Sequence, residues 1–176
     1  MEASPTQASL GSKLAALLGR VYYRYPSYLI DAVLEHEPGN RLVAMKNVTV
    51  GEEFFQGHFP GSPLMPAVLM IEALTQVAAV LVLDRAGAPL TARAFLRGVD
   101  SAKFRRSVVP GDRLRLEVAL TRSRSRLARV EAAAYVDEQV VAEAKLLIAI
   151  DSGAAAVDPT AHVDPSAQIG EGTTIG

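Results

Sequence analysis

The stretch Phe55–Gln76, FQGHFPGSPLMPAVLMIEALTQ, contains a turn followed at once by the start of a helix. His58 lies in its first half, among glycines and prolines that favour a turn. Pro66 then suits the first turn of a helix, because the N–H that proline lacks would have no partner there. The sequence therefore predicts a histidine presented on a turn, directly before a long helix.

The helix predicted to follow ends near Gly87 and is apolar on all sides. From Ala67 to Leu83, only Glu72, Thr75 and Gln76 are polar. A helix of this kind is buried, and a buried carboxyl group is costly to ionise unless it has a task. Glu72 is therefore expected to keep its proton and to donate it. A histidine on a turn and a protonated acid in a core are the two parts of an acid–base catalyst.

Composition limits the remaining function classes. The chain has 176 residues, is 49% hydrophobic and carries a formal net charge of -1, which indicates one main domain without the charge of a nucleic-acid-binding protein. It has no cysteine, so disulfides and thiolate metal sites are excluded. Its three histidines do not show the spacing of metal ligands: His36, His58 and His162. The N-terminus lacks the basic start and long apolar core of a signal peptide, which favours a cytoplasmic protein.

A membrane span is the alternative interpretation of the apolar helix. Pro66–Leu83 has 18 residues, close to the ~20 that cross a bilayer. Glu72 and Gln76 lie near its middle, where polar groups are expensive, and strand-like segments flank it. These features favour the core helix of a globular domain and no membrane span.

Around this helix, alternating or continuous apolar runs predict strands. The predicted strands are Tyr28–Glu35, Arg41–Val50, Leu90–Val99, Arg113–Thr121, Leu127–Val136 and Val140–Ile150. Turns are expected at Glu37–Asn40, Pro110–Asp112 and Asp137–Glu138, and a short amphipathic helix over residues 9–19. Strands, one buried helix and then more strands are typical of the α+β class.

The central motif also resembles a known family. HFPGSPLMPAVLMIEALTQ is similar to the signature of the beta-hydroxyacyl-acyl-carrier-protein dehydratases of fatty acid synthesis, in the form with a glutamate on the central helix. RYPSYLIDAVLEHEPGNRLVAMKNVT upstream and FLRGVDSAKFRRSVVPGDRLRLEV downstream resemble the same family, so that the similarity runs roughly from Tyr23 to Ile150. The resemblance implies a hotdog fold, an antiparallel sheet wrapped round one long buried helix, over residues 20–150, after an N-terminal segment 1–19.

Residues after Ile150 show a different pattern. Residues 151–156 form a small-residue linker, and aliphatic residues then recur every six positions: Val157, Val163, Ile169 and Ile175. A period of six is typical of a β-helix, and VDPTAHVDPSAQIGEGTTIG resembles the opening coil of the left-handed β-helix UDP-N-acetylglucosamine acyltransferase of lipid A synthesis. Because several coils are needed to bury a core, residues 157–176 are expected to form a partial coil that does not fold alone. This interpretation makes the chain a dehydratase with part of a fused acyltransferase.

The resemblance assigns chemical roles to three residues. Dehydration of a (3R)-hydroxyacyl thioester needs a base at C2, a proton donor at the C3 hydroxyl and hydrogen-bond donors for the carbonyl oxygen, with no metal or cofactor. It implies His58 as the base, Glu72 as the acid and the backbone N–H of Ala67 as the oxyanion donor, at a position where the family usually has glycine. Gln76, one turn after Glu72, either orients that carboxyl group or only packs.

Partners follow from the same resemblance. In the family, the histidine of one protomer and the glutamate of its neighbour form each active site, which implies a homodimer here and a trimer of dimers beyond it. Candidates for an acyl tunnel, for which plain core packing is the alternative, are Phe59, Leu64, Val68, Leu69 and Phe95. The substrate's acyl carrier protein is acidic, and eleven of the 18 Lys and Arg residues lie between Arg93 and Arg129, against three acids. A carrier patch, with a merely solvated strand face as the alternative, is expected at Lys103, Arg105, Arg106, Arg122, Arg124 and Arg126.

Two other functions compete with dehydration. A hotdog thioesterase would hydrolyse the thioester, and the pairing of the HFPGSP turn with Glu72 argues against it. A non-catalytic acyl-binding or scaffolding module is kept open by Ala67 and by the hexapeptide segment. Turnover of a 3-hydroxyacyl substrate would separate all three.

Overall fold

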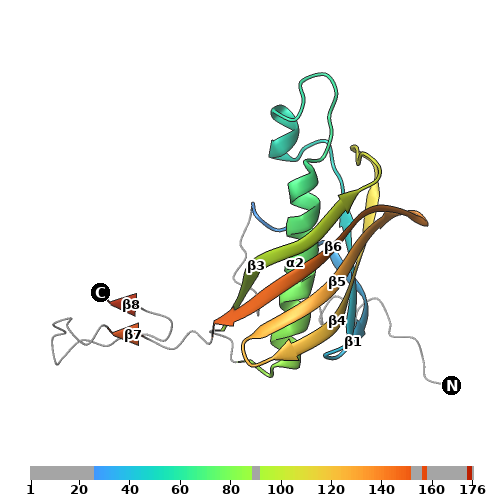
Figure 1. The fold of residues 1–176 in the computed structure, drawn as a ribbon. Helices are drawn as coiled ribbons and strands as arrows, with labels where there is room; N and C mark the ends of the chain where they lie inside the picture. The colour runs from blue at the N-terminus through green and yellow to red at the C-terminus, as the bar shows by residue number, and fades with distance from the viewer. Residues whose placement is uncertain (1–25, 89–91, 152–155, 158–173, 176) are drawn as a thin grey trace.

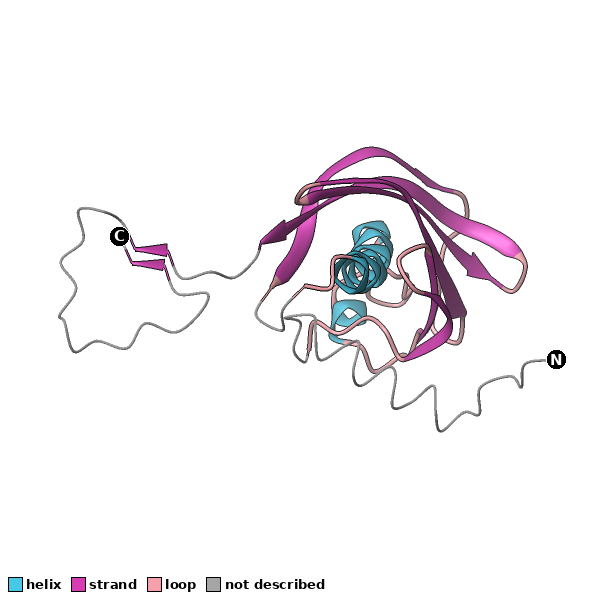
Figure 2. Cartoon of the chain, turned by 90° about the horizontal axis from the view of Figure 1, so that it is seen from below, coloured by secondary structure: helices cyan, strands magenta, loops and turns pink. Residues whose placement is uncertain are grey.

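A long helix, α2 (Ala67–Arg85), runs through the hollow of a strongly curved antiparallel sheet (Figure 1). The computed structural model describes residues 26–88, 92–151, 156–157 and 174–175. The sheet has six strands in the order β1-β2-β4-β5-β6-β3. Their bounds are β1 Ala32–Glu37, β2 Arg41–Asn47, β3 Arg93–Phe104, β4 Arg113–Arg124, β5 Leu127–Val136 and β6 Gln139–Asp151. Seen along the helix, the sheet curls around α2 (Figure 2), which confirms the α+β class and the hotdog fold.

The interior of the molecule consists of α2 and the inward face of the sheet. Every residue of α2 from Met70 to Leu83 is buried except Glu72. The apolar ones pack against alternate residues of the strands, such as Leu114 and Leu116 of β4. By length and composition α2 could cross a membrane, but 72% of its most apolar stretch is buried inside the fold. The apolar circumference of α2 is therefore explained by the sheet that surrounds it.

Both ends of α2 lie where the sequence predicts them. Pro66 is extended (φ -55°, ψ 131°) and precedes the first helical residue, Ala67. At the other end, Gly87 follows with a φ of +55°, a value that favours glycine. Arg85 in the last turn donates from Nη1 to the carbonyl oxygen of Gly39 (3.0 Å), which ties the end of α2 to the β1–β2 hairpin.

Five of the six strands differ from their predicted bounds, by three residues or fewer at either end except in β1 and β3. β1 begins at Ala32 and not at Tyr28, because the backbone at Leu29 hydrogen-bonds to the Gln76 side chain of α2 (3.0 Å). β3 extends to Phe104, beyond the predicted end at Val99. Register shifts between Leu96 and Gly98, and again between Val99 and Ser101, break the alternation of its side chains while its pairing with β6 continues.

β3 is an edge strand of this sheet, and it carries three exposed apolar side chains. Phe95, Val99 and Phe104 are all about 45% exposed, at 45%, 44% and 45%. A long edge strand with exposed aromatic residues is a surface on which another strand can pair.

The hexapeptide segment is described only in part. β7 (Ala156–Val157) and β8 (Thr174–Ile175) pair in parallel, and Val157 lies opposite Ile175. That register spans three six-residue repeats, which is the spacing of one coil. The remainder of the segment, and the helix predicted at residues 9–19, lie outside the described residues.

Candidate active site

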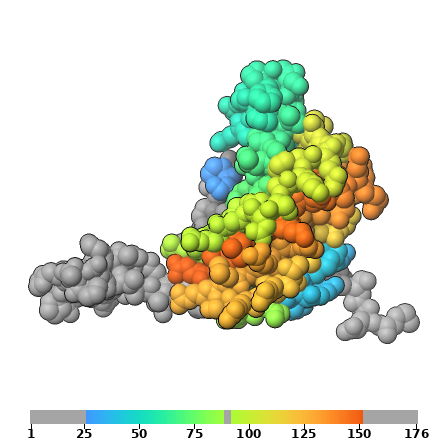
Figure 3. All heavy atoms as spheres, in the orientation of Figure 1, coloured from blue at the N-terminus to red at the C-terminus, as the bar shows by residue number. Residues whose placement is uncertain are grey.

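His58 lies on an arm, residues 48–65, that connects β2 to α2. The arm includes a 3-10 helix, η1 (Glu53–Gln56), and the N–H of His58 donates to the carbonyl oxygen of Phe54 (3.0 Å). In Figure 1 and Figure 3 the arm, coloured teal, projects past the end of the sheet at the N-terminal end of α2. The predicted turn is therefore part of a projecting arm, which places the half-buried His58 outside the core of the domain.

Hydrogen bonds to Leu64 hold the His58 ring in one orientation. Nδ1 lies 2.7 Å from the carbonyl oxygen of Leu64, and the N–H of Leu64 donates back to the carbonyl oxygen of His58 (3.0 Å). Because a carbonyl oxygen only accepts, Nδ1 carries a proton, and in the neutral ring Nε2 is left with its lone pair. The Phe59 ring stacks on the imidazole with 4.0 Å between centroids. A histidine held in this way can act as a base through Nε2.

Gln76 controls the Glu72 carboxyl group. Its Nε2 donates to Glu72 Oε1 (3.0 Å) and to the carbonyl oxygen of Ser27 (2.8 Å), while its Oε1 accepts from the N–H of Leu29 (3.0 Å). The Leu29 N–H fixes which end of the amide faces Glu72. Since Glu72 Oε1 accepts a hydrogen bond, a proton on this carboxyl group belongs on Oε2. Gln76 is therefore packed in the core, and its amide group also holds the Glu72 carboxyl group in one orientation.

Glu72 itself is half-buried, whereas the apolar pattern predicted full burial. The reason is a cavity of about 890 Å³ that opens beside the first turns of α2. Glu72 and Leu69 line it from α2, Lys46 from β2 and Glu52 from the arm. We call this space the Glu72 cavity.

His58 opens onto a different space, the His58 cavity, of about 420 Å³. Ala67 and Met70 line it from α2, Leu64 from the arm and Phe104 from the end of β3. The two cavities share no lining residue. A single chain therefore presents its histidine and its glutamate to separate spaces.

The predicted oxyanion donor lies at the His58 cavity. Ala67 is the first residue of α2 and lines that cavity together with His58. The first N–H groups of a helix have no partner within the helix, and the helix dipole favours negative charge beside them. A thioester oxygen placed here would lie at the positive end of α2.

The predicted tunnel residues fall into three groups. Phe59 and Leu64 line the His58 cavity, and Leu69 lines the Glu72 cavity. Val68 and Phe95 line neither of these two cavities, and they are exposed at 72% and 45%. One chain thus brings together only part of the predicted set.

The predicted carrier patch is divided between the two ends of the sheet. Arg105 and Arg106 line the His58 cavity, and Lys103 is close by on β3. Acids partly balance them: Arg105 contacts Glu143 (2.6 Å) and Arg106 contacts Asp112 (3.3 Å).

Of the other three arginines, Arg122 and Arg124 lie at the far end of β4 and Arg126 in the turn that follows it. Arg113 at the near end of that strand pairs with Asn47 at the base of the arm. Arg124 is eleven residues further along, which is ~36 Å at ~3.3 Å per residue. We call Arg105 and Arg106 the near arginines, and Arg122, Arg124 and Arg126 the far arginines.

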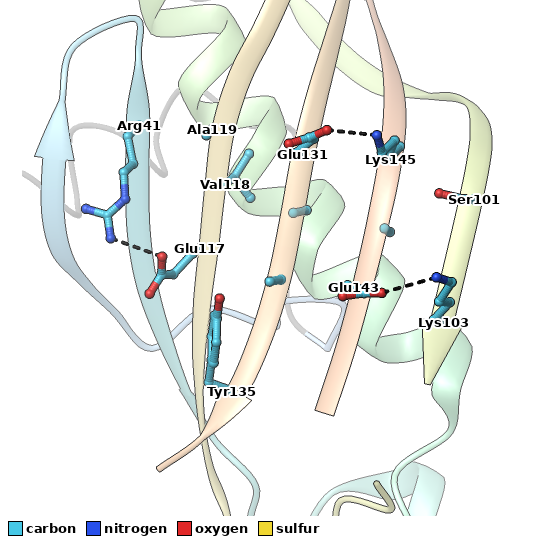
Figure 4. A pocket seen from close by; sticks show the side chains of 13 residues that line it. Arg41, Ser101, Lys103, Glu117, Val118, Ala119, Glu131, Tyr135, Glu143 and Lys145 are labelled. Atoms are coloured by element: carbon cyan, nitrogen blue, oxygen red, sulfur yellow. Dashed lines mark hydrogen bonds and ion pairs between the residues drawn. The ribbon is translucent and has the colours of Figure 1, made fainter. Parts of the chain in front are cut away.

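A further hollow, of about 380 Å³, lies on the outer face of the sheet (Figure 4). Ion pairs between neighbouring strands cross it: Arg41 with Glu117 (3.1 Å), Lys145 with Glu131 (2.9 Å) and Lys103 with Glu143 (3.8 Å). The hydrogen bond with Glu131, and then its charge, raise the pKa of Lys145. These side chains neutralise one another, and no histidine lies among them. Among the described residues, no group of three or more His, Asp or Glu side chains could hold a metal ion.

Two residues beside the site were missed by the sequence interpretation. Lys46 is buried on the inward face of β2 and forms an ion pair with Glu52 of the arm (2.8 Å). A signal for Lys46 was present, because it continues the inward phase of Leu42 and Ala44. The partner was not readable, since nothing in the spacing indicates that the arm folds back on β2.

The chain is similar to known proteins over most of its length. A model of the FabA-like domain matches residues 24–145. The chain is 51% identical over 130 residues to the 3-hydroxyacyl-(acyl-carrier-protein) dehydratase FabZ of Desulforamulus reducens, covering 73% of this chain and 89% of that protein. It is 46% identical over 144 residues to the dehydratase of the same name from Bordetella petrii, covering 79% and 95%.

Solved structures share the fold at low identity. The dehydratase heterocomplex ApeI:P from Xenorhabdus doucetiae superposes with a TM-score of 0.61 at 13% identity, covering 76% of this chain and 89% of that one. Cj0977, a sigma28-regulated virulence protein from Campylobacter jejuni, gives a TM-score of 0.61 at 17% identity, covering 85% and 94%. At such identities the likeness concerns the fold alone.

Proposed function

The chain belongs to the FabA-like domain family, and on that basis we propose that it is a hydro-lyase that dehydrates (3R)-hydroxyacyl-acyl-carrier protein to the trans-2-enoyl product in fatty acid synthesis. Its relatives at 44–51% identity are named for this reaction. The observation on the site that carries the proposal is the His58 ring, held by Leu64 so that Nε2 serves as a base beside the N-terminus of α2.

The residues divide the reaction as follows. His58 Nε2 takes the proton from C2, while the backbone N–H of Ala67 stabilises the negative charge that develops on the thioester oxygen. Glu72 gives its proton from Oε2 to the C3 hydroxyl, which leaves as water as the C2–C3 double bond forms. Gln76 holds the other carboxyl oxygen during this transfer. The products are the enoyl thioester, water, a protonated His58 and an ionised Glu72, and no cofactor or metal is required.

Each active site is proposed to combine two protomers, with His58 from one and Glu72 from the other. Three observations support this: the two residues open onto separate cavities in one chain, the arm projects from the body, and the apolar edge of β3 lacks a neighbouring strand within the described sheet. Phe95 and Val68, exposed in one chain, would then be covered in the dimer and could contribute to the acyl tunnel with Phe59, Leu64 and Leu69. Three dimers would form the hexamer that the family resemblance implies.

The partner that delivers the substrate is proposed to be the acidic acyl carrier protein. The near arginines, with Lys103, lie beside the His58 cavity, where the carrier would have to present its acyl chain. The far arginines lie beyond the range of direct contact with that cavity in the same chain, so their proposed part in recognition is weak steering.

The organisation of the whole chain is proposed from the sequence pattern. Residues 20–150 form the dehydratase domain of a cytoplasmic enzyme, after segment 1–19. Residues 151–156 are a linker, and residues 157–176 are a partial coil of a fused acyltransferase of the lipid A type. The parallel register of β7 and β8, three repeats apart, supports that last assignment.

A turnover assay tests the function. The protein is incubated with 3-hydroxybutyryl-carrier protein, and formation of the enoyl thioester is followed by its absorbance, with His58→Ala as the inactive control. Enoyl formation by the wild type alone supports dehydration. Release of free carrier thiol without enoyl product would instead indicate a thioesterase, and binding without turnover would indicate a scaffolding module.

A further inference from the structure

Lys46 is a buried charge beside the proposed site, and the proposed reaction does not use it. It lies on β2 in the inward series of Leu42 and Ala44 and is 4% exposed. Among the described residues, it is the only buried one with a charged side chain. A buried ammonium group is expensive to keep unless it is paired and hydrogen-bonded.

Its partner is Glu52, the residue before η1. Lys46 Nζ lies 2.8 Å from Glu52 Oε1 and 3.0 Å from Oε2, and it also donates to the carbonyl oxygen of Asn47 (3.4 Å). Glu52 Oε1 additionally accepts from the N–H of Thr49 (3.2 Å). The pair thus joins the end of β2 to the start of the arm, and removing either partner would leave the other charge buried and uncompensated.

Glu52 is joined to His58 by a short series of hydrogen bonds. Phe55 N–H donates to the carbonyl oxygen of Glu52 (3.1 Å), and His58 N–H donates to that of Phe54 (3.0 Å). Beyond His58, the arm is tied down at Met65, whose N–H donates to the carbonyl oxygen of Val108 (2.8 Å). The Lys46–Glu52 pair is therefore a side-chain anchor at the upstream base of the arm, where Val48 also exchanges backbone hydrogen bonds with Gly111 and Asp112.

The same pair also lines the Glu72 cavity. The titratable groups around that cavity come from every element beside it: Tyr28 and Asp31 before β1, Lys46 on β2, Glu52 and Glu53 at η1, and Glu72 on α2. Asp31 accepts from the N–H of Asn47 (2.5 Å). The Glu52 carboxylate therefore neutralises the Lys46 ammonium group at the edge of the Glu72 cavity.

We infer that Lys46 and Glu52 are a positioning pair for the proposed dehydration: they anchor the arm that carries His58, and by neutralising each other they add no net charge to the cavity that Glu72 lines. The inference rests on the proposed function. Neither residue touches the reacting atoms, and both act through the two proposed catalytic residues.

Three variants separate the two effects. Glu52→Gln leaves the Lys46 ammonium unbalanced, which favours ionised Glu72, so the alkaline loss of kcat should move to lower pH. Lys46→Met leaves the Glu52 carboxylate unbalanced and should move that limb to higher pH. The double variant Lys46→Met/Glu52→Gln restores charge balance without the anchor. Its limb should return to the wild-type position, while kcat falls about tenfold to a hundredfold and KM changes less than about threefold.

The control is the exposed Lys145–Glu131 pair on the outer face of the same sheet. Lys145→Met/Glu131→Gln removes the same charges and should leave kcat and its pH profile unchanged. The inference is overturned if the three site variants keep the wild-type pH profile and lose activity only in proportion to the folded fraction seen by melting. It is also overturned if the double variant keeps wild-type kcat. An inactive wild type would instead refute the proposed function.

Discussion

His58 and Glu72 each have one side of their reactive group occupied by a hydrogen bond. Leu64 takes Nδ1 of the imidazole, and Gln76 takes Oε1 of the carboxyl group. The other two atoms, Nε2 and Oε2, are the ones that the proposed dehydration would use. Leu64 and Gln76 would therefore determine which atoms of the two proposed catalytic residues can react.

The His58→Ala variant should lose catalysis but not the fold. His58 lies on the projecting arm and not in the core, and loss of one acid–base group costs ~10²–10⁴-fold in rate. Steady-state kinetics with a carrier-linked substrate measure the loss, and thermal melting serves as the control. More than about a tenth of wild-type activity in a well-folded variant would remove His58 from the role of base.

The Gln76→Met variant should lose both stability and rate. Met fills a similar volume but leaves the buried N–H of Leu29 without its acceptor, which costs about 1–3 kcal/mol of unfolding free energy. It also releases Glu72 Oε1, so kcat should fall more than KM rises. Denaturant melts and steady-state kinetics check the two effects. A variant with lower stability but wild-type kcat would show that Gln76 only packs.

At the scale of elements, the sequence predicts the helix better than the edges of the sheet. Pro66 and Gly87 mark the ends of α2 correctly, because helix termini carry local chemical signals. The end of β3 was predicted five residues too early, because its bulges break the side-chain alternation while the backbone still pairs with β6. Strand bounds depend on partners elsewhere in the chain, and local patterns do not contain them.

The residues of the site show the same contrast between local sequence signals and contacts made only in the complete fold. His58, Glu72 and Ala67 could be proposed as site residues from the sequence because one continuous motif contains them. Lys46 and Glu52 meet only because the arm folds back on β2, and the separation into two cavities depends on the complete fold. The predicted carrier patch combined basic residues that lie at opposite ends of the sheet. These residues are close together in the sequence, but the length of β4, eleven residues from Arg113 to Arg124, separates them in the fold.

The two groups of basic residues should differ in their effect on the carrier. Neutralising Lys103, Arg105 and Arg106 to Gln should raise KM for carrier-linked substrate, because these side chains lie beside the His58 cavity. The matched variant of Arg122, Arg124 and Arg126 removes the same charge at the far end of β4, where salt screens it over ~8 Å, so its effect should be smaller.

A small pantetheine thioester, which lacks the acidic carrier surface, is the control substrate for both variants. It should show little change with either of them. Equal losses on both substrates would point to damage to the fold and not to lost recognition. A larger effect of the far arginines would place the carrier elsewhere.

At the scale of the whole molecule, the hexapeptide segment should be dispensable for the dehydratase domain. The described strands β7 and β8 contact each other and no other described element. Deleting residues from Ala154 onward should therefore leave dehydratase activity and Tm nearly unchanged. A fall in Tm of more than a few degrees would show that the segment supports the hotdog domain.

Each active site is proposed to take His58 from one protomer and Glu72 from its partner. In one chain these residues open onto separate cavities, and the arm projects past the end of the sheet at the N-terminal end of α2. With sites shared in this way, the unit of catalysis would be the assembly and not the single chain.

Mixing two inactive variants is the most direct test of an active site shared between protomers. His58→Ala and Glu72→Gln protomers are combined in equal amounts under conditions of subunit exchange, which native mass spectrometry verifies. Half of the dimers are then mixed, and each holds one site with both groups intact, so about a quarter of wild-type activity should return. Complete exchange with no activity above that of the parent variants would contradict the shared site.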